Sequence, residues 1–300
     1  METTIELAKQ NSCAAALYLD VIKRCLMDSI YWDDPMAAYT LFPSANSPAW
    51  QRYGFGMLQL LVKPFKVRLV KPYSTPIQDY SRWSKEEIRR RAESGRCWPL
   101  RAHTMIGWKR LENIEYCVNT VLQEHVPGDL IETGVWRGGA CIFMRAILKA
   151  NNDTSRTIWV ADSFAGLPSP NESAYPADAR DKHHTFKDFL AVPRSEVEAN
   201  FRRYDLLDDQ VRFLEGWFKD TLPTAPIRRL AVLRLDGDMY ESTIQALEAL
   251  YDKVSLGGFV IVDDYFLPGC RKAVEDFRAR RGIHDAIVDI DGRGTYWRKS

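Results

Sequence analysis

The sequence is poor in the features that mark secreted, disulfide-linked and membrane proteins. Its six cysteines are widely scattered and show no CxxC spacing, which favours reduced, buried thiols in a cytoplasmic protein. No basic N-terminal region with an apolar run and a small-residue cleavage site is present, and no run reaches the roughly 18 apolar residues of a membrane span. The cysteines are Cys13, Cys25, Cys97, Cys117, Cys141 and Cys270.

The chain also lacks an excess of charge of either sign. Lys and Arg number 41 and Asp and Glu 40, so the net charge is +1, which argues against a nucleic-acid partner. With 300 residues, 46% of them apolar, the chain can bury one sizeable core and a smaller appendage. The apolar, basic segment 57–72 allows a membrane-surface role, but packing on the main domain is the favoured interpretation.

Residues 1–100 are expected to form a helical and irregular extension, a lid or an oligomer contact, before a domain over 101–300. Apolar residues at helical spacing predict an amphipathic helix over 13–31. Ser84 and Glu87 have the spacing of a capping box, and Gly95 would end that helix. Residues 32–80 are expected to form loops and short helices, and exposed aromatics are compatible with a homo-oligomer. The helical positions are Ala14, Leu17, Val21 and Cys25, with Ile22, Leu26 and Ile30 alongside.

From residue 129 onward short apolar strands alternate with helices, after a long helix predicted within 104–128. Continuous rather than alternating apolarity predicts strands buried on both faces, as in a parallel sheet covered by helices. The last segment, 286–300, holds two strands around Asp-Gly-Arg-Gly and predicts a closing antiparallel hairpin. The fold class is therefore α/β, with a seven-stranded, mostly parallel sheet. Strands are expected in 129–135, 157–164, 211–218, 230–238 and 257–265, and helices over 138–150, 195–204, 241–252 and 268–281.

Polar residues follow the first three strands, where parallel sheets bind their ligands. The first strand carries Glu132 and leads into a turn at Gly134, and Gly138 and Gly139 would let a helix N-terminus approach a ligand. The second ends in Asp162, where such folds hold ribose, and the third in the run 215–218, where a glycine beside aromatics could flank a purine. The alternative for the glycines is helix packing, for Asp162 a solvated N-cap, and for the aromatics of 215–218 packing in the core. Together, acidic residues on three successive strands favour a nucleoside ligand.

Four aspartates end the next two strands: Asp236, Asp238, Asp263 and Asp264. Like charges about 4 Å apart cost on the order of 4 kcal/mol per pair at an effective dielectric near 20. Protonation, basic partners or a metal ion must offset this repulsion. An oxygen-only set without nearby His or Cys favours a hard cation such as Mg²⁺, and pairing with Arg or Lys is the alternative.

Several motifs resemble those of the macrocin O-methyltransferase family, metal- and S-adenosylmethionine-dependent enzymes that methylate sugar hydroxyls of macrolides and related natural products. The resemblance runs from about residue 16 to the end, except over 44–82, and implies a Rossmann-like class I methyltransferase fold. It is carried by "LYLDVIKRCLMDSIY", "HTMIGWKRLENIEYCV", "DLIETGVWRGGA", "WVADSFAGLP", "DDQVRFLEGWFKDTLP", "LRLDGDMYEST" and "GGFVIVDDY".

This resemblance, with a more distant one to the catechol and caffeoyl-CoA O-methyltransferases, implies a role for each strand end. Metal ligands would be Asp236, Asp263 and Asp264. Asp238 would orient the cofactor's amino group or take a proton. The implied cofactor contacts are Glu132, Gly134 and Val135 to the methionine part, Asp162 and Ser163 to the ribose, Gly216, Trp217 and Phe218 to the adenine, and Thr104 and Met105 as residues that close over the cofactor from the preceding helix.

A metal ion would stabilise the developing alkoxide and orient a vicinal diol toward the sulfonium methyl. Asp238 or Asp236 is then the expected general base. His183 and His184 lie in an insertion after the second strand, where a solvated loop is favoured over catalysis, although the loop could form a lid.

Three other functions compete with methyl transfer to a glycoside or other hydroxylated natural product. A nicotinamide-dependent oxidoreductase has no use for four aspartates on the later strands, and a non-catalytic interaction module leaves their repulsion unexplained. A phenol or catechol acceptor changes only the substrate class.

Overall fold

The computed structural model describes residues 2–30, 57, 61, 64, 84–96 and 101–300. The chain divides into two compact units, one made of Met1–Lys23 with Trp108–Ser300 and the other of Arg24–Gly107. The loops predicted over 32–80, the unmatched stretch 44–82 and Cys97 lie outside the described residues, apart from the three isolated positions. The extension's predicted role as a lid or an oligomer contact stays a prediction.

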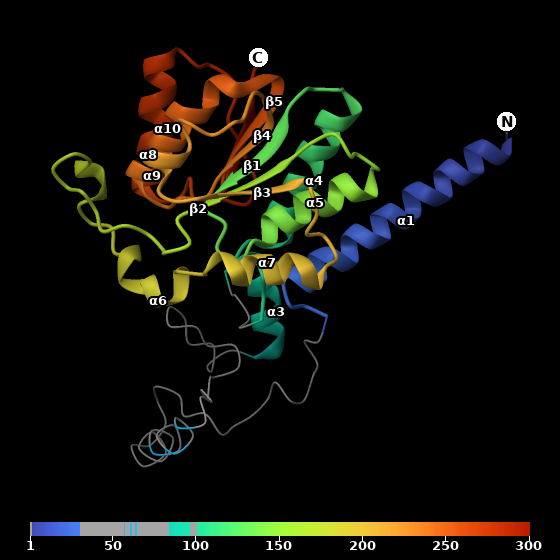
Figure 1. Ribbon diagram of the computed structural model, residues 1–300, viewed down its shortest axis with the longest axis horizontal. Helices are drawn as coiled ribbons and strands as arrows, with labels where there is room; N and C mark the ends of the chain where they lie inside the picture. The colour runs from blue at the N-terminus through green and yellow to red at the C-terminus, as the bar shows by residue number, and fades with distance from the viewer. Residues whose placement is uncertain (1, 31–56, 58–60, 62–63, 65–83, 97–100) are drawn as a thin grey trace. The chain divides into compact units, whose positions relative to one another are not determined.

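The larger unit is built on a seven-stranded sheet with the order β3-β2-β1-β4-β5-β7-β6 (Figure 1). The strands from β1 to β5 pair in parallel, and β7 pairs antiparallel with both β5 and β6. The predicted α/β class and closing hairpin are therefore confirmed. The strands are β1 (Asp129–Thr133), β2 (Ile158–Asp162), β3 (Val211–Glu215), β4 (Leu230–Leu235), β5 (Val254–Val262), β6 (Val288–Asp289) and β7 (Thr295–Arg298).

Helices cover both faces of the sheet. Figure 1 shows α8, α9 and α10 on one side and α4, α5 and α7 on the other. Alternate strand residues such as Ile131, Leu233 and Val260 belong to the core that includes α9 and α10. The intervening residues, Glu132 and Arg234 among them, face the opposite layer. The helices are α4 (Trp108–Gln123), α5 (Gly139–Ala150), α6 (Lys187–Leu190), α7 (Arg194–Arg203), α8 (Phe218–Thr221), α9 (Tyr240–Leu250) and α10 (Pro268–Arg281), with 3-10 turns η3 (Pro176–Asp178), η4 (His183–Phe186) and η5 (Tyr251–Lys253).

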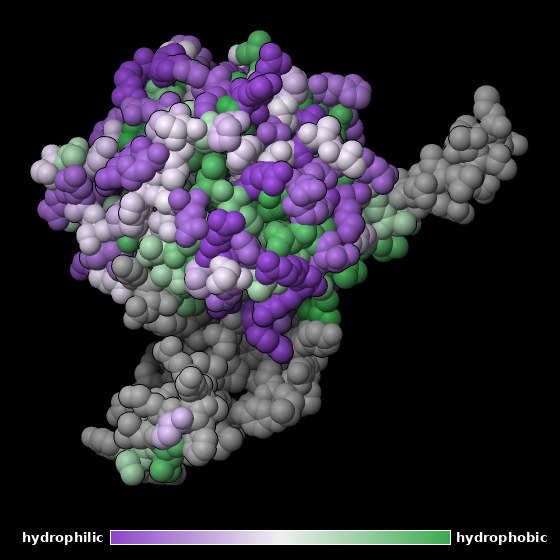
Figure 2. Space-filling view, in the orientation of Figure 1, coloured by the Kyte–Doolittle hydropathy of each residue, from purple (hydrophilic) through white to green (hydrophobic). Residues whose placement is uncertain are grey.

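The first helix, α1 (Glu2–Leu26), begins earlier than predicted and buries a different face. Leu19 and Ile22 are buried, whereas Leu17 and Val21 of the predicted apolar stripe are 62% and 52% exposed. Lys23, the residue after Ile22, is also buried and pairs with Glu115 at 3.0 Å. Figure 2 shows apolar surface on the part of α1 that is coloured. Helical spacing finds apolar stripes but cannot say which one meets the core; the homo-oligomer stays a prediction.

Two further expectations about burial were wrong. Strand β3 lies at the edge of the sheet, so Arg212 and Glu215 are exposed and the strand is not buried on both faces. Among the described cysteines, Cys117, Cys141 and Cys270 are buried free thiols, but Cys13 is exposed and Cys25 half-buried. The exposure of these residues depends on which segments pack against them, and a local apolar pattern does not reveal that.

The helices before β1 are shorter than predicted. Helix α3 (Lys85–Glu93) begins at the Ser84 cap, whose side chain accepts from the Glu87 N–H. The Glu87 carboxylate instead pairs with Arg90 and Arg91, so only half of the capping box forms. The long helix predicted within 104–128 starts at Trp108, because Gly107 packs against the end of α3 so tightly that a Cβ would lie 2.3 Å from the Glu93 carbonyl oxygen.

None of the helices that the structure describes is both long and apolar enough to cross a membrane.

Candidate active site

The register of the central strands brings three chain segments to one edge of the sheet. Thr133 pairs with Leu235 and Leu235 with Val262, and the backbone bonds continue one residue further. The Asp236 N–H donates to Thr133 and the Asp263 N–H to Leu235, both at 2.9 Å. The order reverses between β1 and β4, so these residues lie at the switch point where α/β sheets bind ligands.

Gly134 makes this convergence sterically feasible. Its φ is +90°, a value that side-chain-bearing residues rarely adopt, and an added Cβ would lie 1.7 Å from the Asp236 carbonyl oxygen. The predicted tight turn is therefore present, and the backbone after β1 runs against the backbone after β4.

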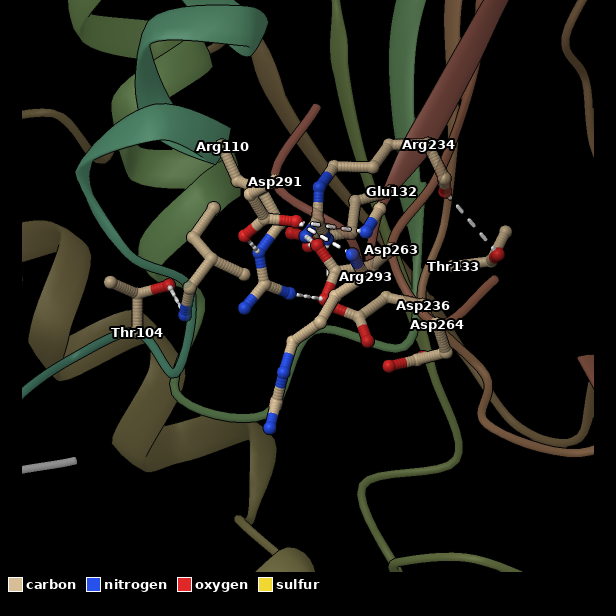
Figure 3. A network of polar contacts seen from close by, with 12 residues as sticks. Thr104, Arg110, Glu132, Thr133, Arg234, Asp236, Asp263, Asp264, Asp291 and Arg293 are labelled. Carbon is tan, nitrogen blue, oxygen red and sulfur yellow. Dashed lines mark hydrogen bonds and ion pairs between the residues drawn. The ribbon is translucent and has the colours of Figure 1, made fainter. Parts of the chain in front are cut away.

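Asp236, Asp263 and Asp264 form the predicted carboxylate cluster. Each offers one oxygen, and these oxygens all lie within 4.8 Å of one another. Asp263 and Asp264 are buried and Asp236 is half-buried. Figure 3 shows the carboxyl groups of Asp236 and Asp264 facing each other. Spacing and donor type both fit a hard divalent cation.

Two arginines hold part of this cluster. Arg234, 1% exposed in the middle of β4, pairs with Glu132 and Asp263 and, at 2.7 Å, with Asp236. Arg110 of α4 pairs with Asp263 and, at 3.1 Å, with Asp291. Basic pairing, the alternative to a metal ion, is therefore present at Asp236 and Asp263.

Arginine pairing does not balance the negative charge. One oxygen each of Asp236, Asp263 and Asp264 lies within 4.8 Å of the others, and like charges at that spacing repel one another. Burial, with the neighbouring aspartates, raises the pKa of Asp264 well above its ordinary value. Carboxyl groups that repel one another at this spacing are suited to share a divalent cation. The residues present therefore fit Mg²⁺.

Asp238 lies beside the cluster, and its backbone contacts one member of it. Its φ is +57°, and its N–H donates to Asp264 at 3.2 Å. Burial raises the pKa of Asp238 to about 7, although the positive charge of His183 opposes that rise.

The acidic residues of the first two strands are engaged within the protein. The Glu132 carboxylate pairs with Arg234 and accepts a hydrogen bond from the Cys141 thiol at 2.9 Å. The Asp162 carboxylate accepts from the N–H groups of Val135 at 2.7 Å and Phe164 at 2.8 Å. Asp162 thereby holds the turn after β1, and the predicted contacts of both residues with a cofactor stay predictions.

The remaining predicted cofactor residues differ in their surroundings. Trp217 is 38% exposed, whereas Phe218 packs against the core on the α9 side. The Ser163 hydroxyl donates to the Gly166 carbonyl at 2.8 Å. Thr104 and Met105 belong to the unit Arg24–Gly107 and precede α4 rather than lying in a helix. Their predicted contact with a cofactor is therefore untested.

Comparison with known proteins supports an O-methyltransferase. The family model described as macrocin O-methyltransferase matches residues 15–299. The chain belongs to the macrocin O-methyltransferase family. It is therefore an O-methyltransferase, and the oxidoreductase and interaction-module alternatives are rejected.

Curated members of the macrocin O-methyltransferase family match at high identity. Demethyldecarbamoylnovobiocin O-methyltransferase of Streptomyces niveus is 47% identical over 301 residues, covering 100% of both chains. A tetracenomycin 4'-O-methyltransferase of Streptomyces olivaceus, named for a dimethoxy-rhamnosyl substrate, is 61% identical over 68% of this chain and 78% of its own length. Mycinamicin III 3''-O-methyltransferase of Micromonospora griseorubida is 56% identical over 69% and 83%.

Solved structures of methyltransferases share the fold. The O-methyltransferase NovP, 47% identical, aligns over 95% of this chain and 99% of its own with a TM-score of 0.75. The calicheamicin methyltransferase CalS11, 22% identical, aligns over 75% and 98% with a TM-score of 0.53, a likeness of fold alone. The predicted class I methyltransferase fold is confirmed.

Sequence reasoning missed the buried arginines and the acid that accompanies them. A charged residue inside the apolar run "LAVLRLDGD" was an available signal for Arg234, since arginine is almost never fully buried unless it is paired. Arg110 and Asp291 come from a helix and from the closing hairpin. No local pattern links them to Asp263.

Replacing Arg234 with Leu should lower the free energy of unfolding by about 3 to 5 kcal/mol, because the buried Glu132 carboxylate loses its cation and Asp263 loses one of its two. Urea unfolding monitored by circular dichroism measures the change. Arg280→Leu is the matched control. Arg280 pairs with Glu248 where the side chains are 55% and 53% exposed, so its loss should cost less than about 1 kcal/mol. Equal losses of unfolding free energy in the two variants would show that the buried ion pairs of Arg234 stabilise the fold no more than an exposed pair does.

Proposed function

We propose that this enzyme transfers the methyl group of S-adenosylmethionine to a hydroxyl of a deoxysugar on a macrolide or related natural product, in antibiotic biosynthesis, with Mg²⁺ held by Asp236, Asp263 and Asp264. The observation that carries the proposal is the carboxylate cluster at the ends of β4 and β5, in a chain of this family. When bound, Mg²⁺ would supply Lewis-acid stabilisation of negative charge on the acceptor oxygen.

The residues of the chain support the remaining steps. Arg110 and Arg234 fix the orientation of Asp263 from both sides. Asp238 is the proposed general base, because burial brings its pKa to about 7, close to the pH at which a base works best. Asp236 is less suited, since one of its oxygens already accepts from Arg234.

The methyl donor is proposed to bind next to this cluster, over the ends of β1, β2 and β3. The turn at Gly134 brings the backbone after β1 against the backbone after β4, and the N-terminus of α5 follows it. Asp162 ends β2 beside this turn, and the exposed Trp217 offers an aromatic face.

The acceptor class is taken from the relatives. The tetracenomycin enzyme's name specifies a rhamnosyl group, and the mycinamicin enzyme's name specifies a 3''-hydroxyl. Both are more than half identical to this chain over the matched regions. A glycosylated acceptor is therefore proposed over a phenol or catechol.

Calorimetry tests the donor and the metal together. Binding of S-adenosylhomocysteine, with Mg²⁺ present, should be measurable in the wild-type enzyme and weaken when EDTA removes the metal. Unchanged binding and unchanged activity in EDTA would contradict the magnesium proposal.

A panel of acceptors tests the substrate class. Desmethyl glycosides, including mycinamicin III and demethyldecarbamoylnovobiocin, are compared with catechols by mass spectrometry. Methylation confined to catechols would contradict the sugar acceptor, and no methylation of any acceptor would contradict the function as a whole.

A further inference from the structure

A β-turn directly after β5 places an exposed aromatic ring close to the carboxylate cluster. The Leu267 N–H donates to the Asp264 carbonyl oxygen at 2.8 Å, which closes a turn with Tyr265 and Phe266 at its tip. The first and last residues of such a turn lie less than about 7 Å apart, so the tip stays near Asp264. Phe266 is 37% exposed, whereas Tyr265 packs against the core that includes α9 and α10. The turn therefore presents the Phe266 ring beside the cluster.

The loop before β7 holds this ring in place. The Phe266 N–H donates to the Arg293 carbonyl oxygen at 3.0 Å. The guanidinium carbon of Arg293 lies over the Phe266 ring, 4.7 Å from its centre, an attractive arrangement of a cation and an aromatic face. Figure 3 shows the Arg293 side chain extending away from Arg234. One backbone hydrogen bond and one stacking contact thus fix where the ring lies.

The loop that carries Arg293 is itself bonded to the site. The Asp291 carboxylate accepts from the N–H groups of Arg293 and Gly294, both at 3.0 Å, and pairs with Arg110 of α4 at 3.1 Å. Gly294 packs closely, because an added Cβ would lie 3.1 Å from the Arg110 side chain and 3.4 Å from the Asp263 carbonyl oxygen. The loop therefore keeps a defined position next to the cluster, and so does the ring that it holds.

The order of the strands places the ring on the side of the cluster opposite the proposed methyl donor. The donor is proposed to lie over the ends of β1, β2 and β3, and the cluster follows β4 and β5. Phe266 and Arg293 lie after β5 and before β7, the next strand of the sheet. In-line attack requires the acceptor oxygen behind the methyl group, on the side away from the sulfur atom. The ring therefore borders the space that the acceptor occupies.

We propose that Phe266, held by Arg293, stacks on the apolar face of the acceptor's sugar ring. The inference rests on the proposed function and deepens it. A pyranose carries C–H groups along a face of its ring, and a deoxysugar lacks one of the hydroxyls, so it can bury apolar surface against an aromatic side chain. The hydroxyls of the bound sugar then face the carboxylate cluster. Arg293 is a positioning residue, because it acts through the Phe266 ring.

Replacing Phe266 with Ala should raise KM for a desmethyl glycoside by about 10-fold, the value of one aromatic contact. The turnover number kcat should change by less than about threefold. Phe266→Leu keeps much of the apolar volume without the flat face, and should raise KM by about threefold. Leu256→Ala is the control and should have the wild-type KM. Leu256 is 71% exposed near the start of β5, roughly 20 Å along the strand from the cluster.

Binding measurements separate acceptor recognition from a structural role. Calorimetry should give the wild-type affinity for S-adenosylhomocysteine in Phe266→Ala, because the ring lies on the acceptor side of the cluster. With S-adenosylhomocysteine and Mg²⁺ present, the Kd of the glycoside should rise by about 10-fold in the same variant. A residue that merely supported the cluster would weaken both ligands.

A double-mutant cycle tests the role of Arg293. Arg293→Ala should raise KM for the glycoside by about threefold, the value of an exposed cation–aromatic contact. The double variant of Phe266→Ala and Arg293→Ala should have the same KM as Phe266→Ala alone, because the arginine has no ring left to hold. Additive effects of the two substitutions would overturn the positioning role.

The outcomes discriminate between the two proposals. Methylation of a glycoside by the wild-type enzyme, combined with an unchanged KM in Phe266→Ala, would overturn this inference alone. So would equal changes of KM in Phe266→Ala and Leu256→Ala. Absence of methyl transfer by the wild-type enzyme to every glycoside in the panel would overturn the proposed function, and the inference with it.

Discussion

Replacing Asp264 with Asn is expected to lower methyl transfer by about 1,000-fold or more while leaving the protein folded. A metal ion acting as Lewis acid contributes several kcal/mol, and each 1.36 kcal/mol corresponds to a tenfold change in rate. The amide removes the negative charge of one ligand but keeps an oxygen that can accept from the Asp238 N–H. Initial rates with saturating Mg²⁺ and donor measure the effect.

Stability should move the other way in the same variant. Burial and three neighbouring aspartates make the Asp264 carboxylate unfavourable in the metal-free protein, so Asn should leave the free energy of unfolding unchanged or raise it by up to about 1 kcal/mol. Mg²⁺ should raise the melting temperature of wild type and not of Asp264→Asn. Asp252→Asn, at a surface pair with Arg281, is the control for both assays. Wild-type activity in Asp264→Asn would rule out this residue as a ligand.

Replacing Gly134 with Ala is expected to lower the free energy of unfolding by about 5 kcal/mol or more, a loss large enough to prevent stable folding. The new Cβ would lie 1.7 Å from the Asp236 carbonyl oxygen. That oxygen belongs to backbone held by the Asp236–Thr133 hydrogen bond, so no side-chain rotation can relieve the clash. The yield of folded protein and urea unfolding measure the loss.

Gly282→Ala is the matched control, because Gly282 also has a positive φ, +62°, but has nothing within 4 Å of an added Cβ. This substitution should lower the free energy of unfolding by only about 1 to 2 kcal/mol, the cost of placing a residue with a side chain in the left-handed conformation. If Gly134→Ala cost no more than this, the close approach of the two backbone segments would be wrong.

The carboxylate cluster could be predicted because it depends on a rule of architecture. Asp236 follows β4 directly, Asp263 and Asp264 follow β5, and parallel strands end at a common edge. The partners of these residues could not be predicted in the same way. Arg110 and Arg234 meet Asp263 from a helix and a strand interior, and Asp291 of the hairpin pairs with Arg110.

The insertion shows a similar contrast. His183 was favoured as a solvated loop residue because its neighbours in sequence are polar. Its side chain is 35% exposed, and what could not be predicted is that Asp178 of the same insertion caps α9 at Tyr240, 62 residues further along the chain. Contacts between residues so far apart in the chain produce no pattern in the local sequence.

The order of apolar and polar residues was sufficient for the parallel sheet, the closing hairpin, the glycine turn at Gly134 and the acidic strand ends, because strand and turn preferences act over a few neighbouring residues. The chain order did not reveal which stripe of α1 is buried, that β3 is an edge strand, or how Arg234 and Asp181 engage their partners. These features depend on packing between segments far apart in the chain, where burial changes the free energy of each charge and therefore which groups must lie together.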